Sequence, residues 1–247
     1  MTKILVINPV GTDLWDESDK EYLSKFLSKG FQLDVRSLKY GPYSLESSFD
    51  VVLASPFIVE EVKKAEIEGY KAIIINCFLN PGIEAAREVT TIPVVGPGEA
   101  SIYLACMLGE KFSILGLGGT VGSKEYTKLV RSLGLLDRLA SVRTIELPVL
   151  ELDRDREKTF NLLVEAGRRA IEEDGADVLI LGCTGLTGYA SRLTEELKVP
   201  VVDPAVAALK FAEILSTLNL SHSKLVYPRP PRKPRELPSV LKDLEEV

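Results

Sequence analysis

The chain contains an internal repeat in which two similar segments each place a cysteine at the end of an apolar run. The first segment reads Ala72-Ile-Ile-Ile-Asn-Cys77 and the second reads Val178-Leu-Ile-Leu-Gly-Cys183. A Pro-Val-Val segment follows each cysteine, beginning 16 residues after the first, at Pro93, and 17 residues after the second, at Pro200. Self-similarity at a period of about a hundred residues predicts two related half-domains rather than a short-period solenoid.

Short apolar runs alternate with helix-like patterns, which is typical of parallel sheets covered by helices on both faces. We therefore expect an α/β protein of two pseudo-symmetric, flavodoxin-like half-domains, each a parallel sheet flanked by helices, with the active site in the cleft between them. The expected strands are 3–7, 32–37, 50–54, 72–76, 93–95, 111–115, 142–146, 177–181 and 200–202. The expected helices are 17–29, 59–68, 82–89, 99–108, 123–133, 155–174, 190–197 and 205–217.

The repeat also predicts the division of the chain. We expect a first half-domain of residues 1–96 plus 205–220, a second of residues 97–204, and a proline-rich tail of residues 221–247. The last core helix would then pack on the first half. Residues 227–238 hold five prolines and four basic residues, so they favour an extended surface segment over a regular helix or strand interior. A short terminal helix is expected within 237–247.

Composition narrows the classes of function. The net charge is −6 and the isoelectric point about 5.1, which argues against nucleic acid or an anionic membrane surface as a partner. No apolar stretch approaches the roughly 20 residues of a membrane span, and the apolar run at the N-terminus is too short for a secretion signal. Three cysteines make no disulfide scaffold, so we expect a cytoplasmic protein. With nucleic acid and membranes disfavoured, the expected partner is a small molecule.

The repeated cysteines are the strongest candidates for catalysis. Ligands of open α/β sheets bind beyond the carboxyl ends of the strands, where Cys77 and Cys183 are expected. A thiol near a helix N-terminus meets backbone N–H groups that favour the thiolate. Two thiols facing each other across a cleft could act as an acid and a base. Cys106, in contrast, lies in an apolar helical stretch and is interpreted as core filler.

The chain lacks the residues that other kinds of active site require. The single histidine, His222, follows the last core helix and is interpreted as a surface residue, which leaves too few ligands for zinc and no partner for a serine or cysteine triad. The segment Gly116-Leu-Gly-Gly-Thr-Val-Gly matches neither the dinucleotide fingerprint nor a P-loop. We therefore expect neither a metal nor a cofactor.

Small and polar residues at the strand ends and in the adjoining loops are the candidates for binding substrate. Hydroxyls, amides and backbone N–H groups dominate this set, which suits a neutral or weakly anionic ligand rich in carbonyl and N–H groups. For its prolines and glycines, ordinary turn chemistry is the alternative. The candidates are Asn8, Gly41, Ser55, Pro56, Phe78, Asn80, Gly118, Gly119, Thr120, Thr184 and Gly185.

From residue 3 to about 217, the sequence resembles the aspartate/glutamate racemase superfamily and, within it, the hydantoin and allantoin racemase branch. The resemblance is carried by Asn76-Cys-Phe-Leu-Asn-Pro-Gly82, Gly182-Cys-Thr-Gly185, Ile7-Asn-Pro9, Gly41-Pro-Tyr-Ser-Leu-Glu-Ser47 and Val95-Gly-Pro-Gly-Glu-Ala100. It implies a racemase without a cofactor, in which Cys77 and Cys183 alternate as thiolate base and thiol acid, and it also implies a homo-oligomer. The branch typically has Asp where Asn80 stands, and Asn-Thr or Asn-Ser where Val10-Gly11 stands.

The resemblance leaves several reactions open. A 5-substituted hydantoin or an allantoin-like cyclic amide is the expected substrate, and an aspartate or glutamate-type amino acid is an alternative. Arylmalonate decarboxylases keep only the second cysteine, so Cys77 counts against that reaction, whereas maleate isomerases use both. A small-molecule binding module without catalysis is the alternative from another class.

Overall fold

The structure, a computed structural model, describes residues 1–244, apart from the side chains of residues 119–121 and 243. The chain divides into two compact units. Unit 1 comprises Met1–Asn76, Asn80–Gly96 and the chain from Leu209 onward, and unit 2 comprises Cys77–Leu79 and Pro97–Ala208.

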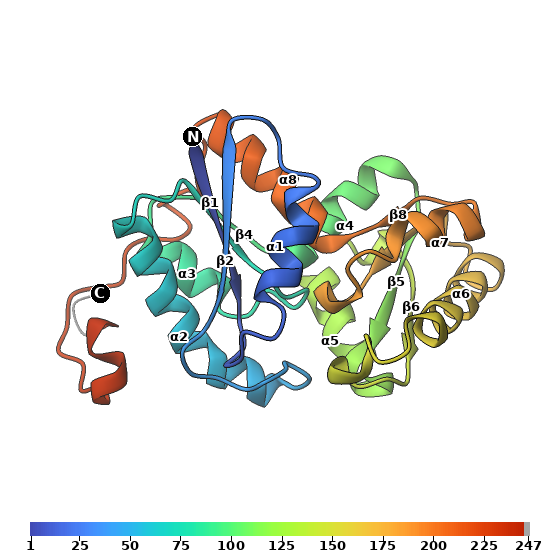
Figure 1. Ribbon diagram of the computed structural model, residues 1–247, viewed down its shortest axis with the longest axis horizontal. Helices are drawn as coiled ribbons and strands as arrows, with labels where there is room; N and C mark the ends of the chain where they lie inside the picture. The colour runs from blue at the N-terminus through green and yellow to red at the C-terminus, as the bar shows by residue number, and fades with distance from the viewer. Residues whose placement is uncertain (245–247) are drawn as a thin grey trace. The chain divides into compact units, whose positions relative to one another are not determined.

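Unit 1 is built on a parallel sheet with the strand order β2-β1-β3-β4. In Figure 1, helices α2 and α3 lie on one side of this sheet and α1 lies on the other. The strands are β1 (Thr2–Asn8), β2 (Phe31–Ser37), β3 (Ala72–Ile75) and β4 (Val94–Val95). The helices are α1 (Asp16–Ser24), α2 (Ser48–Ile67), α3 (Ile83–Val89), the C-terminal part of α8 (Pro204–Thr217) and the 3-10 helix η4 (Ser239–Leu244).

Unit 2 repeats this plan with the strand order β6-β5-β7-β8, again with all neighbouring strands parallel. Helices α4 and α5 lie on one side of its sheet, and α6 and α7 lie on the other (Figure 1). The strands are β5 (Phe112–Leu117), β6 (Leu139–Ile145), β7 (Val178–Leu181) and β8 (Val201–Val202). The helices are α4 (Pro97–Leu108), α5 (Gly119–Ser132), α6 (Arg156–Glu172) and α7 (Ala190–Leu197), with the 3-10 helices η1 (Leu136–Arg138), η2 (Val149–Glu151) and η3 (Thr184–Leu186).

The prediction of two α/β halves with parallel sheets is confirmed. Each half has its first strand second in the sheet order and its third strand beside it, so β3 and β7 occupy equivalent places. Every residue of these two strands is buried. Their apolar runs are uninterrupted because helices cover both faces of a parallel sheet.

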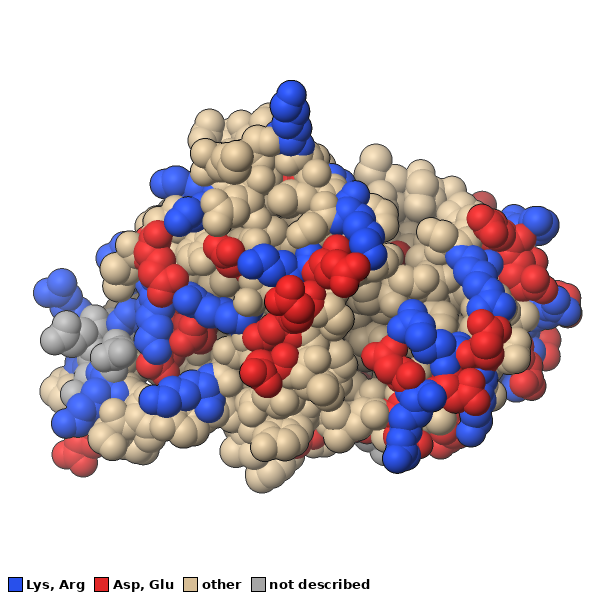
Figure 2. All heavy atoms as spheres, in the orientation of Figure 1, with Lys and Arg blue, Asp and Glu red and all other residues tan. Residues whose placement is uncertain are grey.

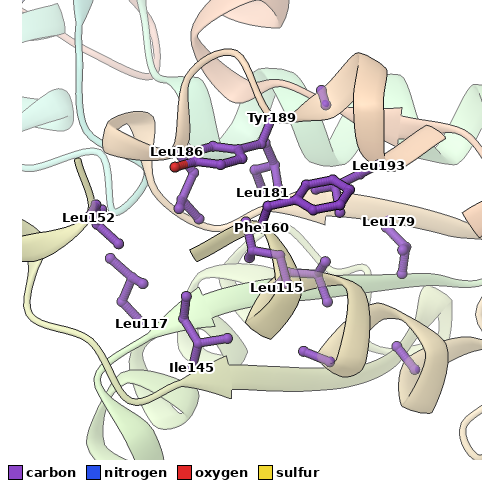
Figure 3. Packing of buried hydrophobic residues seen from close by; sticks show 14 of the residues in the cluster. Leu115, Leu117, Ile145, Leu152, Phe160, Leu179, Leu181, Leu186, Tyr189 and Leu193 are labelled. Carbon is purple, nitrogen blue, oxygen red and sulfur yellow. The ribbon is translucent and has the colours of Figure 1, made fainter. Parts of the chain in front are cut away.

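A cluster of buried apolar residues in unit 2 holds the sheet to α6 and α7. Figure 3 shows Phe160 from α6 and Leu193 from α7 beside the strand residues Leu115, Leu179 and Leu181. Each of these leucines is fully buried. Burial of one such side chain contributes about 1.5–3 kcal/mol, so this packing fixes the strands whose ends carry the functional loops.

The expected strand at 50–54 is wrong, because these residues belong to α2. The hydroxyl of Ser47 accepts a hydrogen bond from the Asp50 N–H at 3.2 Å and caps the helix. The buried residues then follow a helical period along one face, while Val52 and Leu53 stay exposed. Those buried residues are Ala54, Ile58, Val62 and Ala65. Pro56 lies inside this helix and does not begin a turn after a strand.

The interpretation of His222 as a surface residue is also wrong. Its ring is half-buried in unit 1, where the Val94 N–H donates to Nε2 at 3.0 Å. Burial, together with the nearby charge of Arg87, lowers the pKa of His222 to about 4, so the ring is neutral at physiological pH. The tail begins with an anchored segment, since Lys224 also donates to the Arg87 carbonyl at 2.6 Å. Farther along the tail, η4 contacts α2.

Acidic and basic side chains alternate over the surface of α6 and α7 (Figure 2). One pair joins Arg168 to Glu196 at 2.7 Å, and Arg192 pairs with Glu157. Exposed pairs of this kind contribute little to stability. Within residues 1–244, no helix is both long and apolar enough to cross a membrane.

Replacing Ile73 by Ala should destabilise unit 1, because this side chain is fully buried in the central strand β3. We expect a loss of about 2–5 kcal/mol in the free energy of unfolding, from lost burial and the cavity that remains. The matched control is Ile67→Ala, since Ile67 is 85% exposed at the end of α2, and its effect should stay within about 0.5 kcal/mol. Urea denaturation followed by circular dichroism measures both, and equal losses would contradict the assigned core.

Candidate functional site

Both repeat cysteines lie two residues beyond the ends of equivalent strands. Cys77 follows β3 and Cys183 follows β7, with Asn76 and Gly182 as the single intervening residues. Both cysteines belong to unit 2. They are free thiols, and each is partly buried. The carboxyl ends of parallel strands are where α/β proteins bind their ligands, so the position suits a reactive group.

Cys183 is the N-cap residue of the short 3-10 helix η3, and its sulfur caps that helix. This sulfur accepts a hydrogen bond from the Gly185 N–H at 3.3 Å. A Cβ added to Gly185 would lie 3.2 Å from the Leu152 Cδ1 and 3.4 Å from this sulfur, so a larger residue would crowd the thiol. An N–H donor stabilises the negatively charged thiolate more than the neutral thiol.

Cys77 has the corresponding donor, since the backbone N–H of Leu79 also lies two residues after its cysteine. Loss of water around this thiol has the larger effect, and it raises the pKa of Cys77 to about 11. Cys77 therefore carries its proton at neutral pH and can act as an acid.

Tyr126 lies close to both cysteine loops, and the sequence analysis missed it. Its hydroxyl accepts a hydrogen bond from the Leu117 N–H at 3.1 Å, at the carboxyl end of β5. Its ring meets the ring of Phe78 edge-on, with 5.4 Å between centroids. Helix side chains lean towards the helix N-terminus, so a residue in the second turn of α5 reaches back over β5. A glycine-rich loop followed by an aromatic residue in the next helix is the only sequence signal for this arrangement.

Gly116 makes room for the tyrosine ring beside the Cys183 loop. A Cβ on Gly116 would lie 2.3 Å from the Tyr126 Cε2, which is too close for any side chain. Gly116 also contacts Gly182, whose added Cβ would lie 2.9 Å from the Gly116 Cα. The two glycines therefore let the tyrosine ring approach the strand end that carries Cys183.

The polar candidates of unit 1 form a separate cluster at the ends of β1 and β3. Asn8 donates from Nδ2 to Asp16 at 2.8 Å and accepts from the Asn76 Nδ2 at 2.8 Å. The Asn76 amide also donates to Asp19 at 3.2 Å, and Ser37 donates to Asp16. Asp16 and Asp19, in the first turn of α1, were missed by the sequence analysis, which considered strand ends and the adjoining loops but no helix residues here. The cluster holds the carboxyl edge of the sheet in a fixed arrangement.

The other candidates of unit 1 lie in loops and in α2. Gly41 packs against Gly11, where a Cβ would lie 2.5 Å from the Gly41 oxygen. Ser55 donates its hydroxyl to the Val51 carbonyl at 2.6 Å inside α2, and Pro56 follows it. Asn80 has a positive φ of 51° and is buried next to Gly96.

The remaining candidates belong to unit 2. Phe78 is almost fully buried against Tyr126, and Gly118 precedes α5 with a φ of 81°. Thr184 begins η3, and its carbonyl accepts the Thr187 hydroxyl. For Gly119 and Thr120 only the backbone conformation belongs to the described part of the structure. Their binding roles, like those of the other candidates, stay predictions.

Cys106 is not core filler, and that interpretation is wrong. It lies on α4 with a partly exposed side chain, and it stands outside the buried residues of that helix. Burial raises the pKa of its thiol, and the charge of Arg138 opposes this effect. No cysteine stands at the position of the second repeat that corresponds to Cys106. Cys106 can therefore serve as a control thiol for the other two.

A pair of cysteines at equivalent strand ends of a duplicated parallel α/β fold defines the class of the protein. Residues 4–212 match the Asp/Glu/hydantoin racemase family. The chain belongs to this family.

Curated proteins that are similar to this chain include hydantoin racemases. The protein from Pseudomonas sp. (strain NS671) is 42% identical over 236 residues, covering 94% of this chain and 93% of the relative. The protein from Paenarthrobacter aurescens is 37% identical over 233 residues, covering 94% and 98%. Among solved structures, allantoin racemase from Klebsiella pneumoniae matches with a TM-score of 0.89 at 32% identity, covering 96% of each chain. These relatives support racemase chemistry, within the isomerases.

Protonation of Cys77 should make stability depend on pH in the alkaline range. The folded thiol has a pKa of about 11, whereas a thiol in the unfolded chain ionises near about 8.5. Between these values the folded chain keeps a proton that the unfolded chain has released, so the free energy of unfolding falls as pH rises.

The measurement is the difference in urea midpoint between the wild type and Cys77→Ser from pH 7 to 10.5. Other groups titrate equally in the two proteins, so they cancel in the difference. We expect the stability of the wild type relative to the variant to be constant below about pH 8 and to decrease above it. A constant difference up to pH 10.5 would show that the folded thiol has an ordinary pKa.

Proposed function

We propose that this protein is a racemase that needs no cofactor and acts at the acidic carbon of a 5-substituted hydantoin or an allantoin-like cyclic amide. The observation that carries the proposal is the pair of thiols at equivalent strand ends, each accepting a backbone N–H from the residue two positions on. The full-length similarity to hydantoin and allantoin racemases supports the substrate class.

Racemisation needs a base on one face of the reacting carbon and an acid on the other. A thiolate removes the proton from the substrate C5 and becomes a thiol. The other thiol then gives its proton to the opposite face and becomes a thiolate, so one proton and one negative charge are exchanged in each turnover. Two such groups suffice without a cofactor, because the adjacent carbonyl delocalises the carbanion as an enolate.

The raised pKa of Cys77 supports its role as the thiol of the resting pair. If one sulfur of the pair is a thiolate, the proposed mechanism places it at Cys183, where the Gly185 N–H donates to the sulfur. A substrate enantiomer that presents its C5 proton to Cys183 reacts directly with this form. The opposite enantiomer requires the proton to move first from Cys77 to Cys183.

The residues beside the thiols favour a cyclic amide over an amino acid as the substrate. Phe78 follows the first cysteine here, and its burial against Tyr126 gives this part of the site an apolar wall. An apolar wall suits a neutral ring better than the charged groups of aspartate or glutamate, because burying an unpaired charge is costly.

Exchange in D₂O tests the reaction and its substrate. Each pure enantiomer of a 5-substituted hydantoin, allantoin, aspartate and glutamate is incubated with the protein, and proton NMR and chiral chromatography follow the label. With two bases, the product enantiomer should carry deuterium while the recovered substrate stays largely protonated at early times. Deuterium at C5 of the cyclic amides supports the proposal, and exchange only into the amino acids would contradict the substrate class. Binding without any exchange would identify a binding module.

Each repeat cysteine should be required for racemisation. We expect Cys77→Ser and Cys183→Ser each to lower the rate by at least about a thousandfold, because a serine hydroxyl is a far weaker acid than a thiol and does not ionise near neutral pH to act as a base. Cys106→Ser is the matched control and should retain the rate of the wild type. Racemisation at the wild-type rate in both directions by Cys183→Ser would disprove the two-base mechanism.

A further inference from the structure

We propose that Tyr126 is a positioning residue of the thiol pair, whose hydroxyl presents a fixed hydrogen-bond donor to the negative charge of the thiolates and favours their charged state. This inference rests on the proposed function for its consequence in turnover. It depends on the arrangement of Tyr126 between two cysteine loops, and its test requires no substrate.

The first observation is the position of the ring. Tyr126 is only 6% exposed, and its ring fills the space left by the missing side chain of Gly116. Gly116 touches Gly182, the residue directly before Cys183. The ring also meets Phe78, the residue directly after Cys77. One tyrosine therefore packs against the neighbours of both thiols.

The second observation is the orientation of the hydroxyl. A phenol oxygen carries one O–H donor and accepts bonds close to the plane of its ring. The Leu117 N–H occupies an acceptor position at 3.1 Å, so the hydroxyl proton is directed away from β5. An O–H group that is buried without an acceptor costs free energy, and an anionic sulfur or a ligand that it activates can relieve this cost.

The third observation is electrostatic. Burial raises the pKa of Tyr126 strongly, and the charge of Cys183 raises it further. The Leu117 N–H lowers this pKa by a smaller amount than Cys183 raises it, and the charge of Cys77 has the smallest effect, which is again to raise it. The hydroxyl therefore remains a neutral donor throughout the working range of pH. The repulsion between an ionised Tyr126 and either thiolate shows that both sulfurs lie within electrostatic range of the phenol oxygen. At that range a neutral O–H group that donates towards a thiolate stabilises its charge.

Charged groups on the neighbouring elements are engaged elsewhere. On α5 itself, Lys128 pairs with Glu125 at 2.7 Å, and on β6 Arg143 pairs with Asp174 at 2.7 Å. In η1, Arg138 donates to the Cys106 carbonyl at 3.0 Å. The other charged groups on these elements are Lys124 and Arg131 on α5, Glu99 on α4 and Asp137 in η1, and the charge effects on Tyr126 come from the two thiols.

The role of the hydroxyl follows from these observations. During turnover the negative charge leaves one sulfur, passes through the substrate and arrives at the other. A donor that is held in place by Leu117 and Gly116 needs no reorganisation as this charge moves, which is the condition for effective electrostatic stabilisation. Removing the hydroxyl should raise the pH at which the thiolate forms.

The experiment measures the rate of alkylation by iodoacetamide against pH in the full-length Cys106→Ser protein, with peptide mass spectrometry to separate Cys77 from Cys183. Tyr126→Phe keeps the ring and its packing and removes only the hydroxyl. We expect its midpoint for Cys183 to rise by about half a unit or more, so that the alkylation rate at pH 7 falls by about three- to tenfold. The acidic limb of kcat/KM should move by the same amount.

Tyr70→Phe is the matched control, because Tyr70 is a buried tyrosine of unit 1 whose hydroxyl donates to Asp34 at 2.9 Å. It should leave both profiles unchanged. Biosynthetic replacement of tyrosine by 3-fluorotyrosine provides a second test that keeps the folded chain. The more acidic phenol should lower the Cys183 midpoint, and this shift should vanish when Tyr126→Phe is labelled in the same way.

An unchanged alkylation profile in Tyr126→Phe would overturn the proposal, even if kcat fell, because the hydroxyl would then act only on the substrate. An equal shift in Tyr70→Phe would overturn it as well, since the effect would then reflect general loss of stability. A shifted profile in a protein that racemises none of the substrates tested would support the role of Tyr126 and contradict the proposed function. The two proposals therefore fail separately.

Discussion

The burial of β3 and β7 on both faces is the constraint on which the rest of the structure depends. Every residue of Ala72–Ile75 and of Val178–Leu181 is buried, so each strand must end where the chain first needs a polar or small residue. Asn76 and Gly182 stand at those ends, and the cysteines follow at once. The hydrophobic effect that stabilises the two sheets thus also places the two thiols at the edge where parallel sheets bind ligands.

Duplication made two equivalent thiol sites, and the proposed mechanism requires one of them to be an acid while the other is a base. Each sulfur accepts an N–H from the residue two positions on, but desolvation raises the pKa of Cys77 to about 11. A racemase that begins each turnover with one acid and one base needs this kind of inequality. Tyr126 adds a donor that interacts with both sites, and Gly116 allows it to lie there.

Much of the fold was predictable because its pattern is local and repeated. The apolar runs and their separation predicted the parallel sheets, and the repeat predicted two of them. The prediction of a strand at 50–54 was wrong because its apolar residues fit the period of a helix as well as that of a strand. The Ser47 cap, together with the core contacts of Ile58 and Val62, selected the helix. Cys106 and His222 were misplaced for a related reason, since the exposure of a side chain depends on what the rest of the chain packs against it.

The sequence by itself determined the duplicated α/β architecture, the family, and the two cysteines at matching strand ends, because strand and helix periodicity and the repeat are properties of neighbouring residues. Only the tertiary structure decided which residues surround the thiols. Tyr126 is 49 residues from Cys77 and 57 from Cys183 along the chain, and no periodicity joins residues so distant. Their proximity comes from the packing of α5 against β5 and from a glycine with no side chain in the way.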